Sequence, residues 1–189
     1  ITSSVAEAIE GGENDGFFIN TGQITGLVDL EGGADTLQNS GTITGEILMA
    51  EGDDILQNSG TIFGNVDLFS GADTYTASGS GLVTGAVNGG IGNDTITGAE
   101  ADDILNGDDD IDIVRGNSGE DTINGGDGND FLYGGADDDF MNGNADDDLI
   151  RGNSGNDELL GAGGADKIFG GAGDDEITGG ALRDVLRGN

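Results

Sequence analysis

Aspartate recurs at every ninth residue in the second half of the chain, and this spacing brings carboxylates together. From Gly89 to Arg187, eleven consecutive nonapeptides begin with Gly, carry Asp at position six and an aliphatic residue or Met at position eight. Two nonapeptides make a coil of eighteen residues, so aspartates eighteen residues apart are expected to stack. Stacked carboxylates repel one another unless a cation lies between them. Calcium fits best, because it accepts several carboxylate and carbonyl oxygens in a more flexible geometry than magnesium does.

The predicted calcium ligands form two files, one along each edge of the stack. One file contains Asp94, Asp112, Asp130, Asp148, Asp166 and Asp184. The other contains Asp103, Asp121, Asp139, Asp157 and Asp175. Glycine permits tight backbone turns that let carbonyl oxygens point into a site. The glycines predicted to take part are Gly89, Gly116, Gly125, Gly134, Gly152 and Gly170.

The first half repeats with a longer period of nineteen residues. The repeats cover 20–38, 39–57 and 58–76, and a related segment at 79–97 leads into the nonapeptides. Each nineteen-residue unit combines a longer segment with one Asp-containing loop, so the coil length stays nearly constant along the chain. Residues 1–19 resemble a degenerate first coil, as terminal repeats often do. Gly16 stands where later coils place Asp.

The nineteen-residue units leave the role of their aspartates open. Asp35, Asp54 and Asp73 keep a Gly two residues earlier but lack the leading Gly pair. They are either calcium ligands or solvated turn residues. Asn20, Asn39 and Asn58 recur at the same period, which predicts a stacked amide ladder at a corner.

The nonapeptides predict a loop of six residues followed by a strand of three, with the central residue of the strand turned inwards. One inward side chain per nine residues is too little for an isolated coil, so neighbouring coils must share a thin core. The nineteen-residue units supply a richer interior, with two predicted files of inward residues. These files are Ile24, Ile43, Ile62 and Val83, and Val28, Ile47, Val66 and Val87.

Composition excludes several classes of function. The 189 residues include 38 acidic and 5 basic side chains, and the net charge of -33 opposes compaction unless cations are bound. Nucleic acids and anionic membranes are repelled by such a chain. The absence of His and Cys excludes catalytic triads with His, zinc sites built on these residues and disulfides. No apolar run approaches the roughly 20 residues of a membrane span, and no signal peptide opens the chain.

The nonapeptides resemble the RTX (repeats-in-toxin) hemolysin-type calcium-binding family, whose repeats follow the pattern GGxGxDxUx. The unit GGDGNDFLY at 125–133 is a near-ideal copy, and the resemblance extends over 89–187. It implies a calcium-bound parallel β-roll, export through a type I secretion channel and a secreted or bacterial cell-surface location. Several units replace the second or fourth Gly, as in GAEADDILN and GDDDIDIVR. Weaker calcium sites are expected at those loops.

We therefore predict an all-β fold, a parallel β-roll or β-helix solenoid of about ten coils. Residues 1–88 are expected to form the nineteen-residue coils, and residues 89–189 the calcium β-roll of the same continuous solenoid. The predicted function is that of a non-catalytic structural module that binds multiple calcium ions, then folds and rigidifies outside the cell. It would serve an adhesin, a surface-layer protein or the tail of a secreted enzyme. The alternative is a fragment of a carbohydrate-active β-solenoid lyase or epimerase, although no residue breaks the repeat to make a catalytic site.

The basic residues occupy one face of the predicted rod. Four of the five occur at outward strand positions of one file, among apolar and aromatic side chains. These four are Arg115, Arg151, Lys167 and Arg187, and their neighbours include Ile113, Phe131, Tyr133 and Leu149. This strip either stacks on itself through cross-strand and cation–π pairs, or forms a contact face for self-association or for the rest of a longer parent chain.

Overall fold

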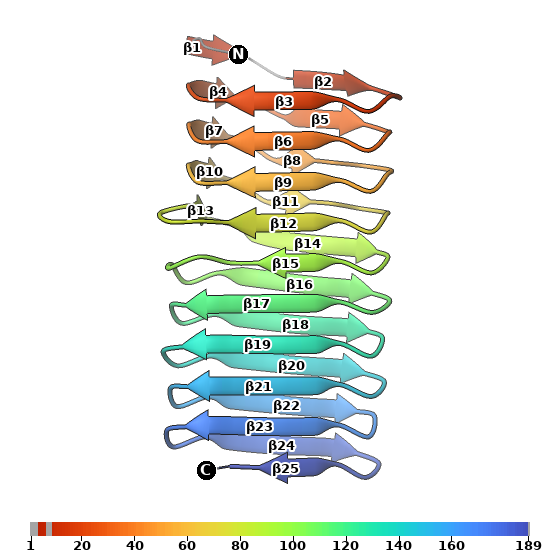
Figure 1. The fold of residues 1–189 in the computed structure, drawn as a ribbon, viewed down its shortest axis with the longest axis vertical. Helices are drawn as coiled ribbons and strands as arrows, with labels where there is room; N and C mark the ends of the chain where they lie inside the picture. The colour runs from red at the N-terminus through yellow and green to blue at the C-terminus, as the bar shows by residue number, and fades with distance from the viewer. Residues whose placement is uncertain (1–3, 7–8, 189) are drawn as a thin grey trace.

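The chain forms a stack of coils in a parallel β-solenoid, which confirms the predicted fold class. The computed structural model describes residues 4–6 and 9–188. About ten coils follow one another along the long axis, with the two ends of the chain at opposite ends of the rod (Figure 1). The first residues of the predicted segment 1–88 and the last residue of 89–189 lie outside the described part.

Three parallel sheets run along the axis. The short sheet covers only the first coils and contains β1 (Ser4–Ala6), β4 (Gln23–Thr25), β7 (Thr42–Thr44), β10 (Thr61–Phe63) and β13 (Leu82–Val83). The back sheet contains β2 (Ile9–Gly12), β5 (Val28–Glu31), β8 (Ile47–Leu48), β11 (Val66–Asp67), β14 (Ala86–Ile91), β16 (Ile104–Asp109), β18 (Thr122–Asp127), β20 (Phe140–Ala145), β22 (Glu158–Gly163) and β24 (Glu176–Ala181). The front sheet contains β3 (Phe17–Asn20), β6 (Thr36–Asn39), β9 (Ile55–Asn58), β12 (Thr74–Ala77), β15 (Thr95–Thr97), β17 (Ile113–Ser118), β19 (Phe131–Ala136), β21 (Leu149–Ser154), β23 (Lys167–Ala172) and β25 (Val185–Arg187).

Strand register follows the sequence periods. In the front sheet Thr36 pairs with Ile55, nineteen residues on, and Ile113 pairs with Phe131, eighteen residues on. The two-residue insertion is absorbed in one step, where Thr74 pairs with Thr95. Both long sheets pass through this step without a break. The change of period therefore alters the shape of the coil but not the continuity of the stack.

The strands of the nonapeptide half are longer than the sequence predicts. Most span six residues, because positions one to three of a nonapeptide continue the strand begun by positions seven to nine of the one before. Gly90 and Ile91, for example, pair with Asp108 and Asp109 of the next coil. The predicted six-residue loop is thus wrong in its first half, where the backbone keeps its ladder of hydrogen bonds. We call positions one to six the Asp-loop, because these residues form the edge of the coil between the two long sheets.

The interior is a narrow column of stacked aliphatic side chains. Both predicted files are fully or almost fully buried, one on the short sheet and the other on the back sheet. Two further inward files were not predicted in the first half. They contain Leu30, Met49 and Leu68 on the back-sheet side, and Leu37, Leu56 and Tyr75 on the front sheet, where the file continues into the predicted position-eight residues from Ile96 onwards. The nonapeptide half keeps mainly the residue at position eight, as in Ile123 and Leu132, and Ala99 is the one buried apolar residue at another position among the described nonapeptides.

Amide ladders fix the corners and the back face. The Asn20 side chain donates to Asn39 Oδ1 at 2.8 Å, and the Asn39 side chain donates to Asn58 Oδ1 at 2.8 Å. These three side chains are buried, which confirms the predicted corner ladder. On the back sheet Asn106 donates to Asn88 at 2.7 Å, and Asn124 donates to Asn106 at 2.9 Å.

Candidate metal centre

The aspartates of one edge form a single chain of hydrogen bonds along the rod. This first edge joins the back sheet to the front sheet. Each Asp backbone N–H donates to Oδ1 of the Asp one coil further on, and the distances lie between 2.6 and 3.1 Å. The chain begins at the Gly16 N–H, in the degenerate first coil. The acceptors are Asp35, Asp54, Asp73, Asp94, Asp112, Asp130, Asp148, Asp166 and Asp184.

The second edge, which joins the front sheet back to the back sheet, carries a shorter file of the same kind. The Asp103 N–H donates to Asp121 Oδ1 at 2.8 Å, and the pattern continues at 3.0 to 3.2 Å. The later acceptors are Asp139, Asp157 and Asp175. The structure therefore brings the predicted aspartates together in two files, as the eighteen-residue spacing requires.

The second carboxylate oxygen of nearly every stacked Asp is buried without a hydrogen-bond partner. These Oδ2 atoms belong to Asp35, Asp54, Asp73, Asp94, Asp112, Asp121, Asp130, Asp139, Asp148, Asp157, Asp166 and Asp175. A buried carboxylate oxygen without a donor costs substantial desolvation free energy. So many orphaned oxygens in regular files indicate a missing positive charge rather than a local packing defect.

Burial without a counter-charge makes these carboxyls weak acids. Desolvation is the main cause that raises the pKa of Asp112 and Asp148 to about 8, although the backbone N–H that each accepts lowers it. Neighbouring aspartates of the same file raise it further, because like charges disfavour ionisation. The same causes raise the pKa of Asp121 and Asp139 to about 7. At neutral pH, the metal-free files thus hold protons that a cation would displace.

The Asp-loops share one backbone conformation. In every nonapeptide except 98–106, positions two and four both have positive φ. Position two is often not Gly, as at Asn117 (φ 77°) and Ala162 (φ 69°), and position four is Leu182 (φ 69°) in the last unit. The left-handed region costs a residue other than Gly roughly 1 to 2 kcal/mol, so contacts elsewhere must hold these loops in place. Weaker binding at the units without Gly stays a prediction, and of these units only 98–106 has a different loop conformation.

The backbone carbonyl oxygen of the residue at position four lies against the loop of the next coil. A Cβ atom at Gly128 would overlap the carbonyl oxygen of Asp110, and one at Gly155 would overlap that of Asp137. Each such oxygen therefore lies against the loop of the next coil. Two stacked loops thus offer buried Asp Oδ2 atoms together with backbone carbonyl oxygens.

The invariant first Gly of each nonapeptide has a steric reason. A Cβ atom at Gly89 would lie 2.5 Å from Oδ2 of Asp94, and the other leading glycines meet the Asp of their own unit in the same way. Any side chain here would displace the carboxylate. A ligand role for the carbonyls of Gly89, Gly116, Gly125, Gly134, Gly152 and Gly170 stays a prediction.

The Asp-loop at 98–103 departs from the others. Ala99 and Ala101 occupy positions two and four, and neither has positive φ. Oδ2 of Asp103 accepts a hydrogen bond of 3.1 Å from the Ala99 N–H and so has a partner. This loop lies where the short sheet has ended and the second edge begins. Among the predicted ligands, Asp103 is therefore the one whose surroundings fit a cation least well.

The chemistry of these groups fits calcium. Among residues 4–6 and 9–188, no three acidic side chains gather into a cluster that could hold a metal unaided. A cation must therefore take further oxygens from the backbone, and calcium readily combines carboxylate with carbonyl ligands. The stacked position-four carbonyls and the orphaned Oδ2 atoms form a donor set of this kind.

Comparison with protein families agrees with this geometry. Residues 86–114, 115–150 and 151–186 match the RTX calcium-binding nonapeptide repeat, which covers more than half of the chain. The chain belongs to the RTX repeat family. A search of curated proteins finds no match. The RTX match begins near the point where the nineteen-residue coils give way to nonapeptides. It therefore does not include the first-edge loops of the nineteen-residue coils.

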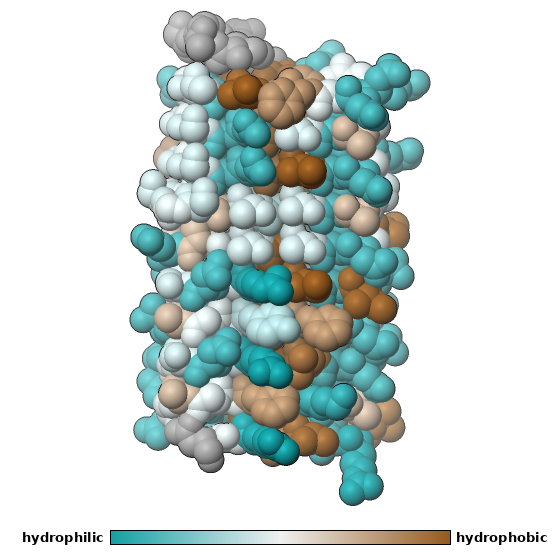
Figure 2. Space-filling model, viewed as in Figure 1, coloured by the Kyte–Doolittle hydropathy of each residue, from teal (hydrophilic) through white to brown (hydrophobic). Residues whose placement is uncertain are grey.

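Three arginines of the RTX half stack on aromatic rings of the front sheet. The guanidinium of Arg115 lies 5.0 Å from the ring centroid of Tyr133, and that of Arg151 lies 5.1 Å from Phe169. Arg187 approaches the other side of the same ring at 5.7 Å. The alternating column runs down the middle of the front face in Figure 2. The predicted stacking of this strip is confirmed.

Calcium-free protein should become more stable as pH falls from about 8 to about 4. The pKa values of buried aspartates such as Asp112 lie above the ordinary value of 3.8, so the folded form binds more protons than the unfolded form in this interval. Their contribution to stability is complete below about 3.8 and is lost as pH rises through the folded pKa values. Thermal unfolding in metal-depleted buffer measures this, and stability that rises with pH there would contradict it.

Replacing Asp103 by Asn should leave the number of bound calcium ions unchanged, whereas Asp121→Asn should remove about one ion per chain. The two residues belong to the same edge and the same file, but only Asp121 has an orphaned Oδ2. Equilibrium dialysis at saturating calcium measures the count. An equal loss in both variants would show that the loop at 98–103 binds calcium despite its different backbone.

Proposed function

We propose that this chain is a calcium-dependent structural module of a secreted RTX protein. The observation that carries the proposal is the double file of buried, unpartnered Asp Oδ2 atoms. Bound calcium would supply the positive charge that these files lack. Asp94, Asp112, Asp130, Asp148 and Asp166 would hold it on the first edge, and Asp121, Asp139, Asp157 and Asp175 on the second.

Folding and binding are coupled in such an arrangement. In the unfolded chain the aspartates lie apart, and they converge only when coils stack. Calcium therefore favours the stacked state, because the site exists only there. Low calcium before export would keep the nonapeptides open, which suits passage through a type I secretion channel. Extracellular calcium in the millimolar range would then close the rod.

The nineteen-residue coils have a different part in this scheme. Residues 1–88 bury more apolar side chains per coil than residues 89–189, and we propose that they form a nucleus that folds without metal. The nonapeptides would then add to this end as calcium binds. The long sheets continue across the junction, so each new coil finds an existing edge to pair with.

The repeat itself supports a structural rather than a catalytic role. No helix in the described residues is long and apolar enough to cross a membrane. Many polar side chains of the described coils take part in amide ladders, cation–π stacks and the Asp files. Nothing among them combines an acid, a base and a substrate cleft as a lyase or epimerase requires. We propose that the module acts as a spacer or stabiliser within its parent protein, at the cell surface or outside the cell.

Circular dichroism with calcium titration tests the main proposal on the full chain. We expect the nonapeptide half to be disordered in chelator, so that the spectrum keeps only the β signal of the nineteen-residue coils, and a full β spectrum at roughly millimolar calcium with a much smaller response to magnesium. Hydrogen exchange in chelator should then show protection confined to the nineteen-residue coils. A spectrum that is fully β and indifferent to chelator would refute calcium-driven folding.

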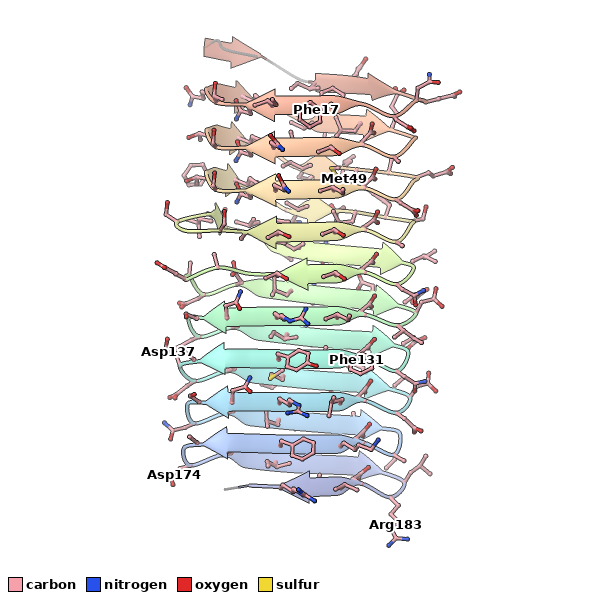
Figure 3. All side chains as sticks on the ribbon, viewed as in Figure 1. Phe17, Met49, Phe131, Asp137, Asp174 and Arg183 are labelled. Carbon is pink, nitrogen blue, oxygen red and sulfur yellow. The ribbon has the colours of Figure 1, made fainter. Side chains whose placement is uncertain are left out.

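We also propose that two copies of the rod associate through the front face. The exposed apolar side chains there include Phe131, which is 40% exposed and is labelled on β19 in Figure 3. It pairs with Ile113 and Leu149 in the neighbouring strands, so these three residues form one column. The neighbouring column with Tyr133 adds arginines, which suit the acidic edges of a second copy. Such a contact leaves the Asp-loops free to bind calcium.

Phe131→Asp combined with Leu149→Asp should make the calcium-loaded protein monomeric without changing its calcium titration. Ile104→Asp on the back sheet is the matched control, since Ile104 is also half-exposed at 45%. Sedimentation velocity gives the readout. An unchanged sedimentation coefficient in the double variant would rule out this face as the contact.

A further inference from the structure

The first-edge file of aspartates continues beyond the RTX repeats into the nineteen-residue coils. Asp35, Asp54 and Asp73 are each 1% exposed, and each accepts the same backbone hydrogen bond as the aspartates of the nonapeptides. Their Oδ2 atoms are likewise buried without a partner. Figure 1 shows the corresponding loops in one column at the right-hand side, from β5–β6 down to β24–β25. The family match begins only at residue 86 and so leaves these three loops outside.

The backbone of these loops has the conformation of the nonapeptide loops. Position two has positive φ at Glu31 (65°), Ala50 (74°) and Phe69 (73°), although none of these residues is Gly, Asn or Asp. Position four has positive φ as well, at Gly33 (111°), Gly52 (141°) and Gly71 (154°). The loop at 98–103, by contrast, has lost both turns although it lies within the family match. Sequence similarity and loop conformation therefore divide the chain differently.

The carbonyl stack is also the same. A Cβ atom at Gly52 would overlap the carbonyl oxygen of Gly33, one at Gly71 would overlap that of Gly52, and one at Gly92 would overlap that of Gly71. Position-four carbonyls therefore lie against the next coil throughout the first edge. The step from Gly71 to Gly92 crosses the junction between the halves without a break.

One position differs between the two kinds of loop. The nonapeptides begin with Gly, whereas the nineteen-residue coils have Leu30, Met49 and Leu68 at the same register, with side chains buried in the core. The third sheet widens these coils enough to hold the larger side chains. The Asp Oδ2 atoms beside them are nevertheless buried and unpartnered, as they are in the nonapeptides.

We propose that the first edge of the nineteen-residue coils binds calcium at three further sites, between the stacked loops 30–35 and 49–54, 49–54 and 68–73, and 68–73 and 89–94. Each site has a buried Asp from both loops and the position-four carbonyl of the earlier loop. Calcium binding would then follow one edge along the whole rod but start later on the other edge. The inference rests on the proposed calcium-binding function and extends it beyond the family repeats.

The triple variant Asp35→Asn, Asp54→Asn, Asp73→Asn tests this inference in the full chain. Asn keeps an oxygen for the backbone hydrogen bond but removes the charge, and the four inward files of the first half keep its coils packed. We expect about three fewer calcium ions per chain by equilibrium dialysis at saturating calcium. The control Glu10→Gln, Glu13→Gln, Glu46→Gln removes the same charge from exposed side chains of these coils and should keep the full count.

The outcomes separate this inference from the function on which it rests. If the triple variant binds as many ions as the wild type, the three sites do not exist, while calcium-driven folding of the nonapeptides stands. If the wild type binds no calcium, the proposed function itself fails. Should the triple variant not fold, Asp54→Asn alone decides the matter, because Asp54 borders two of the sites. A loss of about two ions supports the proposal, and an unchanged count overturns it.

Discussion

The whole architecture depends on one contact, the backbone N–H of an Asp donating to Oδ1 of the Asp in the next coil. This contact stacks the edges in register and withdraws most carboxylates of the two files from water. It satisfies only one of the two oxygens, so each added coil also adds a buried acceptor without a donor. A solenoid built in this way cannot extend on hydrogen bonds alone. Each coil that improves the ladder also increases the repulsion along the file, and either protonation or a bound metal ion removes that conflict.

Glycine and left-handed backbone follow from the same contact. The carboxylate lies over the first residue of its own nonapeptide, so no Cβ fits at Gly89 or Gly125. The turns at positions two and four are less strict in residue type, since Asn117, Ala162 and Leu182 all adopt positive φ. The ladder of the long sheets holds these residues in a conformation that they seldom adopt alone. In the nonapeptides, the overlap between a Cβ atom and the Asp carboxylate therefore restricts the residue type at position one more strongly than the positive φ does at positions two and four.

The repeat period predicts most of the fold because it restricts every coil at once. The stacking of Asp112 on Asp130 and of Ile24 on Ile43 follows from counting residues, and the structure confirms both. The split of each longer segment into two strands was not predicted, since it depends on a corner at residues such as Gly45, whose φ is 149°. The different conformation of the loop at 98–103 could have been predicted from the sequence. This loop belongs to the nonapeptide with Ala at both turn positions, where the others have Gly, Asn or Asp at one or both.

The first position of the Asp-loop separates two ways of stabilising a coil. The coil at 39–57 buries Ile43, Ile47, Met49 and Leu56, whereas a nonapeptide pair such as 116–133 buries only Ile123 and Leu132. Two additional buried aliphatic side chains contribute about 3 to 6 kcal/mol, which a two-sheet coil with Gly at position one lacks. Such a coil has the Asp site in place of a wider core, and the proposed calcium would supply the stability that the smaller core lacks. The nineteen-residue coils keep both the core and the Asp file. If the proposals above hold, these coils begin the stack without calcium and also offer the first row of calcium ligands.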